Sequence, residues 1–123
     1  MKTDIKLSNE DLILTTEMEK KYPKMTAEFR NICAEQYLMF LKKQHDYGPS
    51  NIAINTQLET DEDIKNSLIG ITVRCSDKVS RLVNLILKRK DEKPKNESIV
   101  DTFVDMSIYS KIAMIVLRGK WAK

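Results

Sequence analysis

The sequence ESIVDTFVDMSIYSKIAMIV, residues 97–116, is the most informative segment for the fold. Its apolar residues wrap almost all round a helical axis, which predicts a helix that is covered on every side. The carboxylates of Glu97, Asp101 and Asp105 are nevertheless spaced four residues apart, and Tyr109 continues the line. A four-residue step turns a helix by only about 40°, so these groups share one narrow stripe. Like charges in such a stripe repel one another, and we expect a positive partner beside them.

Apolar spacing and helix-stop residues predict two helices in the N-terminal half. Ser8 or its neighbour can cap a first helix over about 9–20, and Pro23 stops it. A second helix starts near Thr26 and is broken by DYGPSN at 46–51, because glycine and proline cannot continue a helix. Its predicted core face consists of Phe29, Ile32, Cys33, Tyr37, Phe40 and Leu41.

The C-terminal half predicts two further helices. Thr60 opens the third with a capping-box-like start, and this helix runs to about Lys90. Its apolar face is predicted from Ile64, Leu68, Ile71, Cys75, Val79, Leu82 and Ile86. Asn96 is the predicted cap of the last helix, which reaches about Arg118, and Gly119 stops it. Trp121 is expected to fold back as an anchor.

Composition bounds the class of protein. The 123 residues suit one domain, and only three glycines and three prolines favour a few long helices. We therefore predict an all-α, four-helix fold with a single domain over 1–123, of which 1–7 are frayed. The net charge of +3 is too small to predict direct nucleic acid binding. We expect no leader peptide, no membrane span, and two reduced core cysteines, Cys33 and Cys75, which together predict a cytoplasmic protein.

A basic stripe precedes the acidic one. The sequence RCSDKVSR carries Arg74, Asp77, Lys78 and Arg81 at helical spacing. Consecutive helices joined by a short link usually pack antiparallel, so the two stripes are predicted to face each other. Such an arrangement can be a salt-bridge network without a ligand. It can also be a cleft in which the bases bind phosphates while the acids hold Mg²⁺ or ribose hydroxyls.

The segment HDYGPSN, residues 45–51, adds a possible nucleobase contact. Tyr47 can stack on a base, and Asp46 or Asn51 can hydrogen-bond to its edge, although the same residues also suit an ordinary helix stop. The candidate nucleotide-binding residues are Arg74, Lys78, Arg81, Asp46, Tyr47, Asn51 and Tyr109. The candidate metal ligands, for Mg²⁺, are Asp101, Asp105, Glu97 and Asp77.

Three motifs in order, HDYGPSNI, VRCSDKVSRL and ESIVDTFVDMSIY, resemble the nucleotide modification associated domain 1 family, a small all-α family of bacteriophages and prophages. The resemblance covers about residues 35–118. It implies a MazG-like bundle that binds a nucleotide or nucleoside phosphate, is completed by homo-oligomerisation, and works in the host cytoplasm if it is phage-encoded. MazG-like pyrophosphohydrolases hold Mg²⁺ with Glu-x-x-Glu and Glu-x-x-Asp motifs on two facing helices.

The chain departs from that metal-binding pattern. Asp101 and Asp105 are four residues apart rather than three, Thr102 stands at the expected glutamate, and Asp77 is the one acid between Arg74 and Arg81. Two functions therefore stay open beside a purely structural interaction module. One is a Mg²⁺-dependent nucleoside phosphate pyrophosphohydrolase. The other is a non-catalytic phage nucleotide binder that sequesters a nucleotide signal of host defence or supports modified-nucleotide metabolism.

Overall fold

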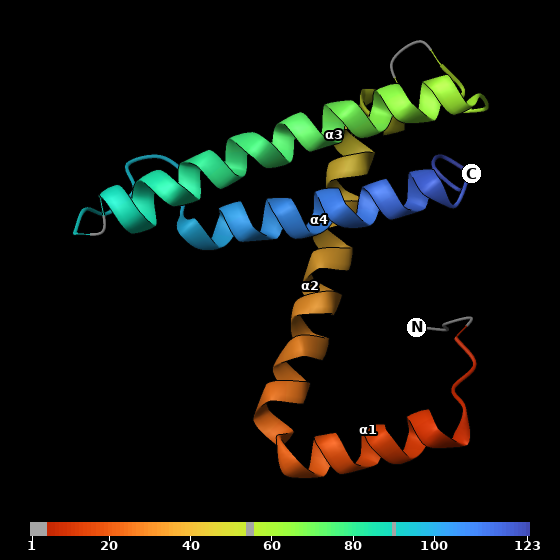
Figure 1. Ribbon diagram of the computed structural model, residues 1–123, viewed down its shortest axis with the longest axis vertical. Helices are drawn as coiled ribbons and strands as arrows, with labels where there is room; N and C mark the ends of the chain where they lie inside the picture. Colours follow the sequence, from red (N-terminus) through yellow and green to blue (C-terminus); the bar gives the residue numbers. More distant parts are fainter. Residues whose placement is uncertain (1–4, 54–55, 90) are drawn as a thin grey trace. The chain divides into compact units, whose positions relative to one another are not determined.

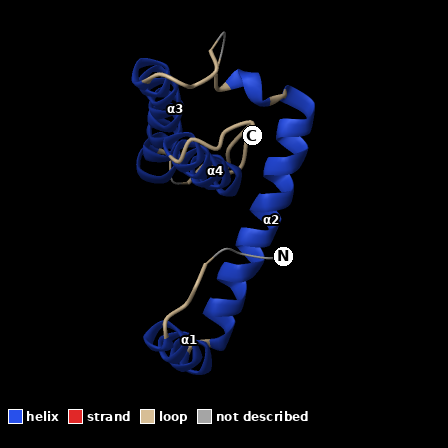
Figure 2. Cartoon of the chain, turned by 90° about the vertical axis from the view of Figure 1, so that its right-hand side faces the viewer, coloured by secondary structure: helices blue, strands red, loops and turns tan. Residues whose placement is uncertain are grey.

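The computed structural model describes residues 5–53, 56–89 and 91–123. Over these residues the chain is all-α, as predicted, with four α-helices and no strand (Figures 1 and 2). It divides into two compact units, Met1–Met39 and Phe40–Lys123. None of the helices in the described ranges is both long and apolar enough to cross a membrane. The prediction of one domain over 1–123 stays a prediction.

The first unit contains α1, Asn9–Lys21, and the first part of α2, Pro23–Tyr47. The capping residue of α1 is Ser8, whose side chain accepts a hydrogen bond from the amide of Asp11, while the Asp11 carboxylate accepts from the amide of Ser8. This reciprocal pair fixes the start of the helix. Residues 5–7 precede it without regular structure, and the rest of the predicted frayed end, 1–4, lies outside the described residues.

The predicted core face of the second helix is largely wrong. Of its six residues only Phe40 packs against the hydrophobic core. The other five are exposed, namely Phe29, Ile32, Cys33, Tyr37 and Leu41. The helix is also longer than predicted because Pro23 begins it, which proline does well since the first helical turn needs no amide donor there. Cys33 is therefore not a core cysteine, whereas Cys75 is half-buried against the core.

The second unit begins with the end of α2 and a tight turn. Gly48 has a φ of +75°, which glycine adopts without strain, and Pro49 then opens the short 3₁₀ helix η1, Pro49–Asn51. The predicted helix stop at 46–51 is thus confirmed. The carbonyl of Pro49 accepts a 2.9 Å hydrogen bond from the indole of Trp121, whose ring also meets Phe40 edge-on at 6.1 Å. Trp121 is buried and anchors this turn, as predicted.

Helices α3, Asp61–Leu82, and α4, Ile99–Leu117, pack side by side and antiparallel (Figure 1). Thr60 caps α3 as predicted, and Gly119, with a φ of +67°, ends α4. A π-helical segment, η2, extends α3 over Val83–Lys88, so the helical run stops short of the predicted end at Lys90, which lies outside the described residues. The core between these elements consists of Ile52, Ile71, Ile108, Ile112, Val116 and Trp121.

Two predicted details of these helices are wrong. Ser98, not Asn96, caps α4, because the hydroxyl of Ser98 accepts the amide of Asp101 at 3.1 Å. Glu97 therefore precedes the helix instead of lying in its first turn. On the predicted apolar face of α3, Val79 is 46% exposed and Ile86 41% exposed.

Candidate functional site

The basic side of α3 faces the acids at the start of α4. Lys78 lies between two of them, with its ammonium 2.8 Å from the Asp105 carboxylate and 3.2 Å from that of Glu97. Lys43, at the end of α2, adds a 3.1 Å ion pair to Asp105. The prediction that the basic and acidic stripes face each other is confirmed for Lys78 with Glu97 and Asp105. Asp105 and Lys78 are both largely shielded, with side-chain exposures of 16% and 20%.

The two lysines set the charge of Asp105. Burial by itself would raise the pKa of the Asp105 carboxyl, but the hydrogen bonds from Lys78 and Lys43 outweigh it and hold the pKa below its ordinary value. The hydrogen bond to Asp105 raises the pKa of Lys78, against the burial that would lower it. The network therefore keeps both partners ionised at neutral pH.

Arg81 supports the start of α4. Its guanidinium hydrogen-bonds to the carbonyl of Glu97 and to the hydroxyl of Thr102, which is completely buried. Thr102 in turn donates to the carbonyl of Ser98 at 3.2 Å. The buried hydroxyl of Thr102 therefore both donates and accepts a hydrogen bond, and the carbonyl of Glu97 accepts from a charged donor. These hydrogen bonds stabilise the start of α4. Arg81 and Lys78 thus contact protein groups, and neither lines a cavity described below.

The structure does not bring the other acids into this network. Asp101, Asp77 and Asp46 are exposed. Asp101 lies in the first turn of α4, where the helix dipole favours an acid, and no ion pair joins it to a base of the described residues, so the expected positive partner is not found beside it. Asp46 pairs with its neighbour His45 at 3.0 Å. In the described ranges no group of three or more His, Cys, Asp or Glu side chains is placed to hold a metal ion. The Mg²⁺ site stays a prediction.

A cavity of about 440 Å³ opens between the end of α2, the turn after it, α3 and α4. The N-terminal wall consists of Lys43, Gln44, Tyr47, Asn51 and Ile52. The remaining lining comes from α3 and α4 and consists of Arg74, Asp105, Ile108, Tyr109 and Ile112. This volume lies within the usual range for small-molecule sites, about 300–1,000 Å³. The cavity gathers five of the predicted site residues, namely Arg74, Tyr47, Asn51, Tyr109 and Asp105.

Arg74 is the notable charge of this cavity. Its guanidinium lies over the ring of Tyr109, 5.9 Å from the ring centroid, and the residue is half-buried. Within the described parts of the chain no carboxylate forms an ion pair with it, in contrast to Lys43 and Lys78. A half-buried arginine without an anionic partner is suited to binding an anion from solution.

Two buried amide oxygens also lie at this cavity. Gln44 Oε1 and Asn51 Oδ1 have no hydrogen-bond partner among the described residues. Buried side-chain oxygens are nearly always hydrogen-bonded in folded proteins, so an orphan pair at one cavity is able to accept hydrogen bonds from a bound ligand or water. The backbone on either side of this turn is held in place, because Gly48 donates its amide to the carbonyl of Gln44 at 2.9 Å and Trp121 donates its indole N–H to the carbonyl of Pro49.

Sequence reasoning missed Lys43 and Gln44. Lys43 lies four residues before Tyr47 and Gln44 lies three residues before it, so both are on the same face of α2 as Tyr47. That spacing was the available signal. The prediction considered only the residues of the turn motif at 46–51.

Comparison with known proteins adds no family to this geometry. Neither a protein-family model, nor a curated protein, nor a solved structure matches the chain. The resemblance to the nucleotide modification associated domain 1 family accordingly stays a prediction.

Proposed function

We propose that the protein binds a nucleotide in the 440 Å³ cavity, with Arg74 contacting the phosphate. The observation that carries the proposal is this half-buried guanidinium, which lines the cavity, lies over Tyr109 and has no carboxylate partner in the described residues. Arginine binds phosphate oxygens through a planar fork of donors, and such charge-assisted hydrogen bonds are among the stronger ones in proteins.

The rest of the cavity supports a nucleobase. The orphan oxygens of Gln44 and Asn51 accept hydrogen bonds, which fits the exocyclic amino group or ring N–H of a base. Tyr47 and Tyr109 provide aromatic rings on two sides of the cavity, and bases stack readily on such rings. Ile108 and Ile112 add apolar surface to the lining. Anion, aromatic and amide contacts together favour a nucleotide over an inorganic phosphate.

Binding without hydrolysis is the form of this function that we favour. Asp105 is the one carboxylate that lines the cavity, and two ammonium groups already hold it at 2.8 and 3.1 Å. A phosphate-bound Mg²⁺ would have to displace Lys43 or Lys78 to reach it. The second candidate is Mg²⁺-dependent hydrolysis of a phosphoanhydride, in which Asp105 would hold the metal and the metal would polarise the phosphate. A protein of the binding kind would suit sequestration of a nucleotide or the support of modified-nucleotide metabolism.

We also propose a homo-oligomer. Val100, Phe103, Met114 and Leu117 of α4 are between 49% and 69% exposed, although this helix is the most apolar of the fold. A helix that is apolar nearly all round requires cover on more than one side. A second copy of the chain would supply that cover.

The test of nucleotide binding is a calorimetric titration of the parent, Arg74→Ala and Arg89→Ala with the four ribonucleoside monophosphates and triphosphates. Arg89 is the matched control, because its side chain is 58% exposed and pairs locally with Glu92. Loss of a charge-assisted hydrogen bond worth roughly 1.5–3 kcal/mol predicts about ten- to hundred-fold weaker binding for Arg74→Ala. Arg89→Ala should bind as the parent does.

A phosphate-release assay with Mg²⁺ on the same proteins separates the two candidates. The binder returns the nucleotide intact, whereas the hydrolase releases product and loses turnover in Asp105→Asn. If Arg74→Ala binds every nucleotide as tightly as the parent, the assignment of the cavity is wrong.

A further inference from the structure

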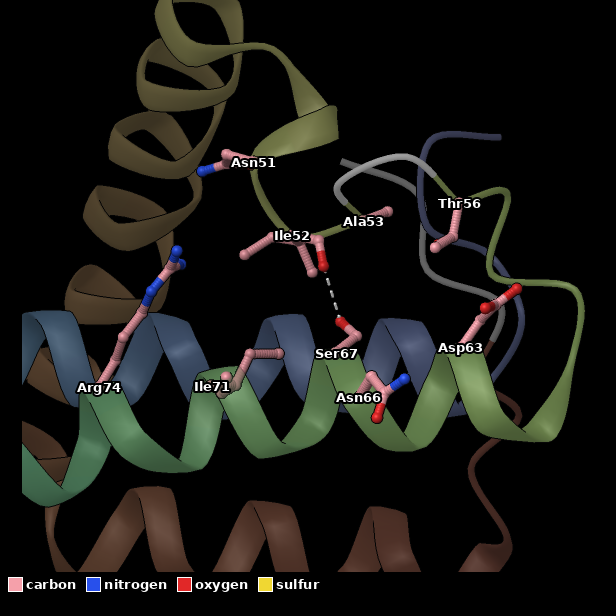
Figure 3. Close-up of a pocket in the computed structure, with 10 residues that line it drawn as sticks. Asn51, Ile52, Ala53, Thr56, Asp63, Asn66, Ser67, Ile71 and Arg74 are labelled. Atoms are coloured by element: carbon pink, nitrogen blue, oxygen red, sulfur yellow. Dashed lines mark hydrogen bonds between the residues drawn. The ribbon is translucent and has the colours of Figure 1, made fainter.

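A second hollow of about 210 Å³ lies along one face of α3 (Figure 3). Its floor is made by Asp63, Asn66, Ser67, Gly70, Ile71 and Arg74, which follow one another at helical spacing. Asn51, Ile52 and Ala53 form its roof, and the hydroxyl of Ser67 donates to the carbonyl of Ile52 at 3.0 Å. This buried hydrogen bond connects α3 to the segment that carries Ile52, on the other side of the hollow.

The hollow and the 440 Å³ cavity meet at Arg74. Arg74, Asn51 and Ile52 line both spaces. In Figure 3 the Arg74 side chain rises from α3 toward the segment that carries Asn51, at one end of the hollow, while Asp63 marks the other end. A phosphate bound by Arg74 would therefore have space on two sides.

The two spaces differ in chemistry. The larger one has two tyrosines and the orphan amide oxygens, which suit a base. The smaller one has no aromatic residue among those that line it, and it offers the side chains of Asp63, Asn66 and Thr56. Carboxylate, amide and hydroxyl groups of this kind bind the hydroxyls of a sugar.

Gly70 gives the hollow its room. A Cβ added to Gly70 would meet no heavy atom within 4 Å, so no packing requires a glycine there. Its φ is not in the left-handed region either. A glycine inside a helix destabilises that helix relative to alanine. The open space in front of Gly70 is the feature that a side chain would remove.

We infer that the ligand is a nucleotide whose phosphate carries a second, hydroxyl-bearing group. The base occupies the 440 Å³ cavity, the phosphate lies at Arg74, and the second group enters the hollow above Gly70. The second group can be a second nucleoside or a sugar. This inference rests on the proposed function and names the class of nucleotide that the site takes.

The experiment compares adenosine monophosphate with two diesters of the same phosphate, a dinucleoside monophosphate and an adenosine monophosphate esterified to a sugar. Calorimetry is run on the parent, Gly70→Leu and, as the matched control, Gly70→Ala. The parent should bind at least one diester about ten-fold more tightly than the monophosphate, as one or two added hydrogen bonds predict. Gly70→Leu should lose that preference and keep the affinity for the monophosphate, while Gly70→Ala keeps most of the preference. The diester that is preferred identifies the second group.

Equal binding of monophosphate and diesters by the parent overturns the inference and leaves the proposed function intact. The same holds if Gly70→Leu keeps the preference. Urea unfolding of both Gly70 variants serves as the folding check, and Gly70→Ser replaces a variant that fails it. If no nucleotide binds the parent, the proposed function fails and the inference fails with it.

Discussion

Replacement of Asp105 by asparagine tests the charge network between α2, α3 and α4. The change removes the charge that binds Lys78 at 2.8 Å and Lys43 at 3.1 Å but keeps the shape of the side chain. Lys78 retains Glu97, whereas the described residues offer Lys43 no other ion pair. The loss of charge-assisted hydrogen bonds in this largely shielded place should lower the free energy of unfolding by about 1–3 kcal/mol.

The effect should depend on pH in a defined direction. The pKa of Asp105 is lowered in the folded protein, so its contribution is present above the unfolded value of about 4 and is lost as pH falls through the folded pKa. The stability difference between parent and Asp105→Asn should thus be constant from about pH 5 to 8 and shrink below about pH 4. The pKa of Lys78 is raised, so its contribution is present below about pH 10 and is lost as pH rises through the folded value.

Urea unfolding followed by circular dichroism, carried out from below about pH 4 to above about pH 10, measures both effects. Asp77→Asn is the matched control, since Asp77 is exposed on α3 and should change stability by less than about 0.5 kcal/mol. If Asp105→Asn and Asp77→Asn are equally stable at pH 7, the network does not hold the helices together and the reasoning is refuted.

Three further predictions concern two glycines and the assembly. Gly119→Ala should lower the free energy of unfolding by about 1 kcal/mol, because Gly119 has a φ of +67° where its amide and that of Lys120 close the end of α4. Gly70→Ala should raise the free energy of unfolding by about 0.5–1 kcal/mol, because alanine favours the helix and its Cβ meets no neighbouring atom. Urea unfolding measures both changes. Light scattering at micromolar concentration should give a mass above that of one chain, and Phe103→Glu should lower it; a monomeric parent would contradict the proposed cover of α4.

The architecture was predictable where local signals are strong. The Ser8 cap, the Thr60 cap and the stop at Gly119 follow from residue types that satisfy free backbone groups at helix ends. The start of α4 was not, because Asn96 and Ser98 are both good caps and only the folded geometry shows which one bonds to Asp101. Because the helix begins two residues later than predicted, Glu97 lies before it and Asp101 is the acid in its first turn.

The candidate site was predictable in part. Helical spacing correctly placed the basic side of α3 against Glu97 and Asp105, but spacing cannot show which base takes which acid. Lys78 and Arg81 bind other groups of the protein, whereas Arg74, one helical turn before Lys78, lines the cavity. Similarly, the core face assigned to α2 failed because apolar spacing shows that residues share a face, but not that another element covers it.

Contact between Arg74 and a nucleotide can be observed in a nuclear magnetic resonance titration that follows the Nε–H signals of the arginine side chains. Nucleotide is added to the parent protein, and the Arg74 signal is assigned by its loss in Arg74→Ala. If Arg74 contacts the phosphate, its signal should shift in a saturable way, while those of Arg81, bound to Thr102, and of Arg89, on the surface, stay in place. A nucleotide that moves other arginine signals and leaves Arg74 unchanged, or that moves none, would contradict binding at Arg74.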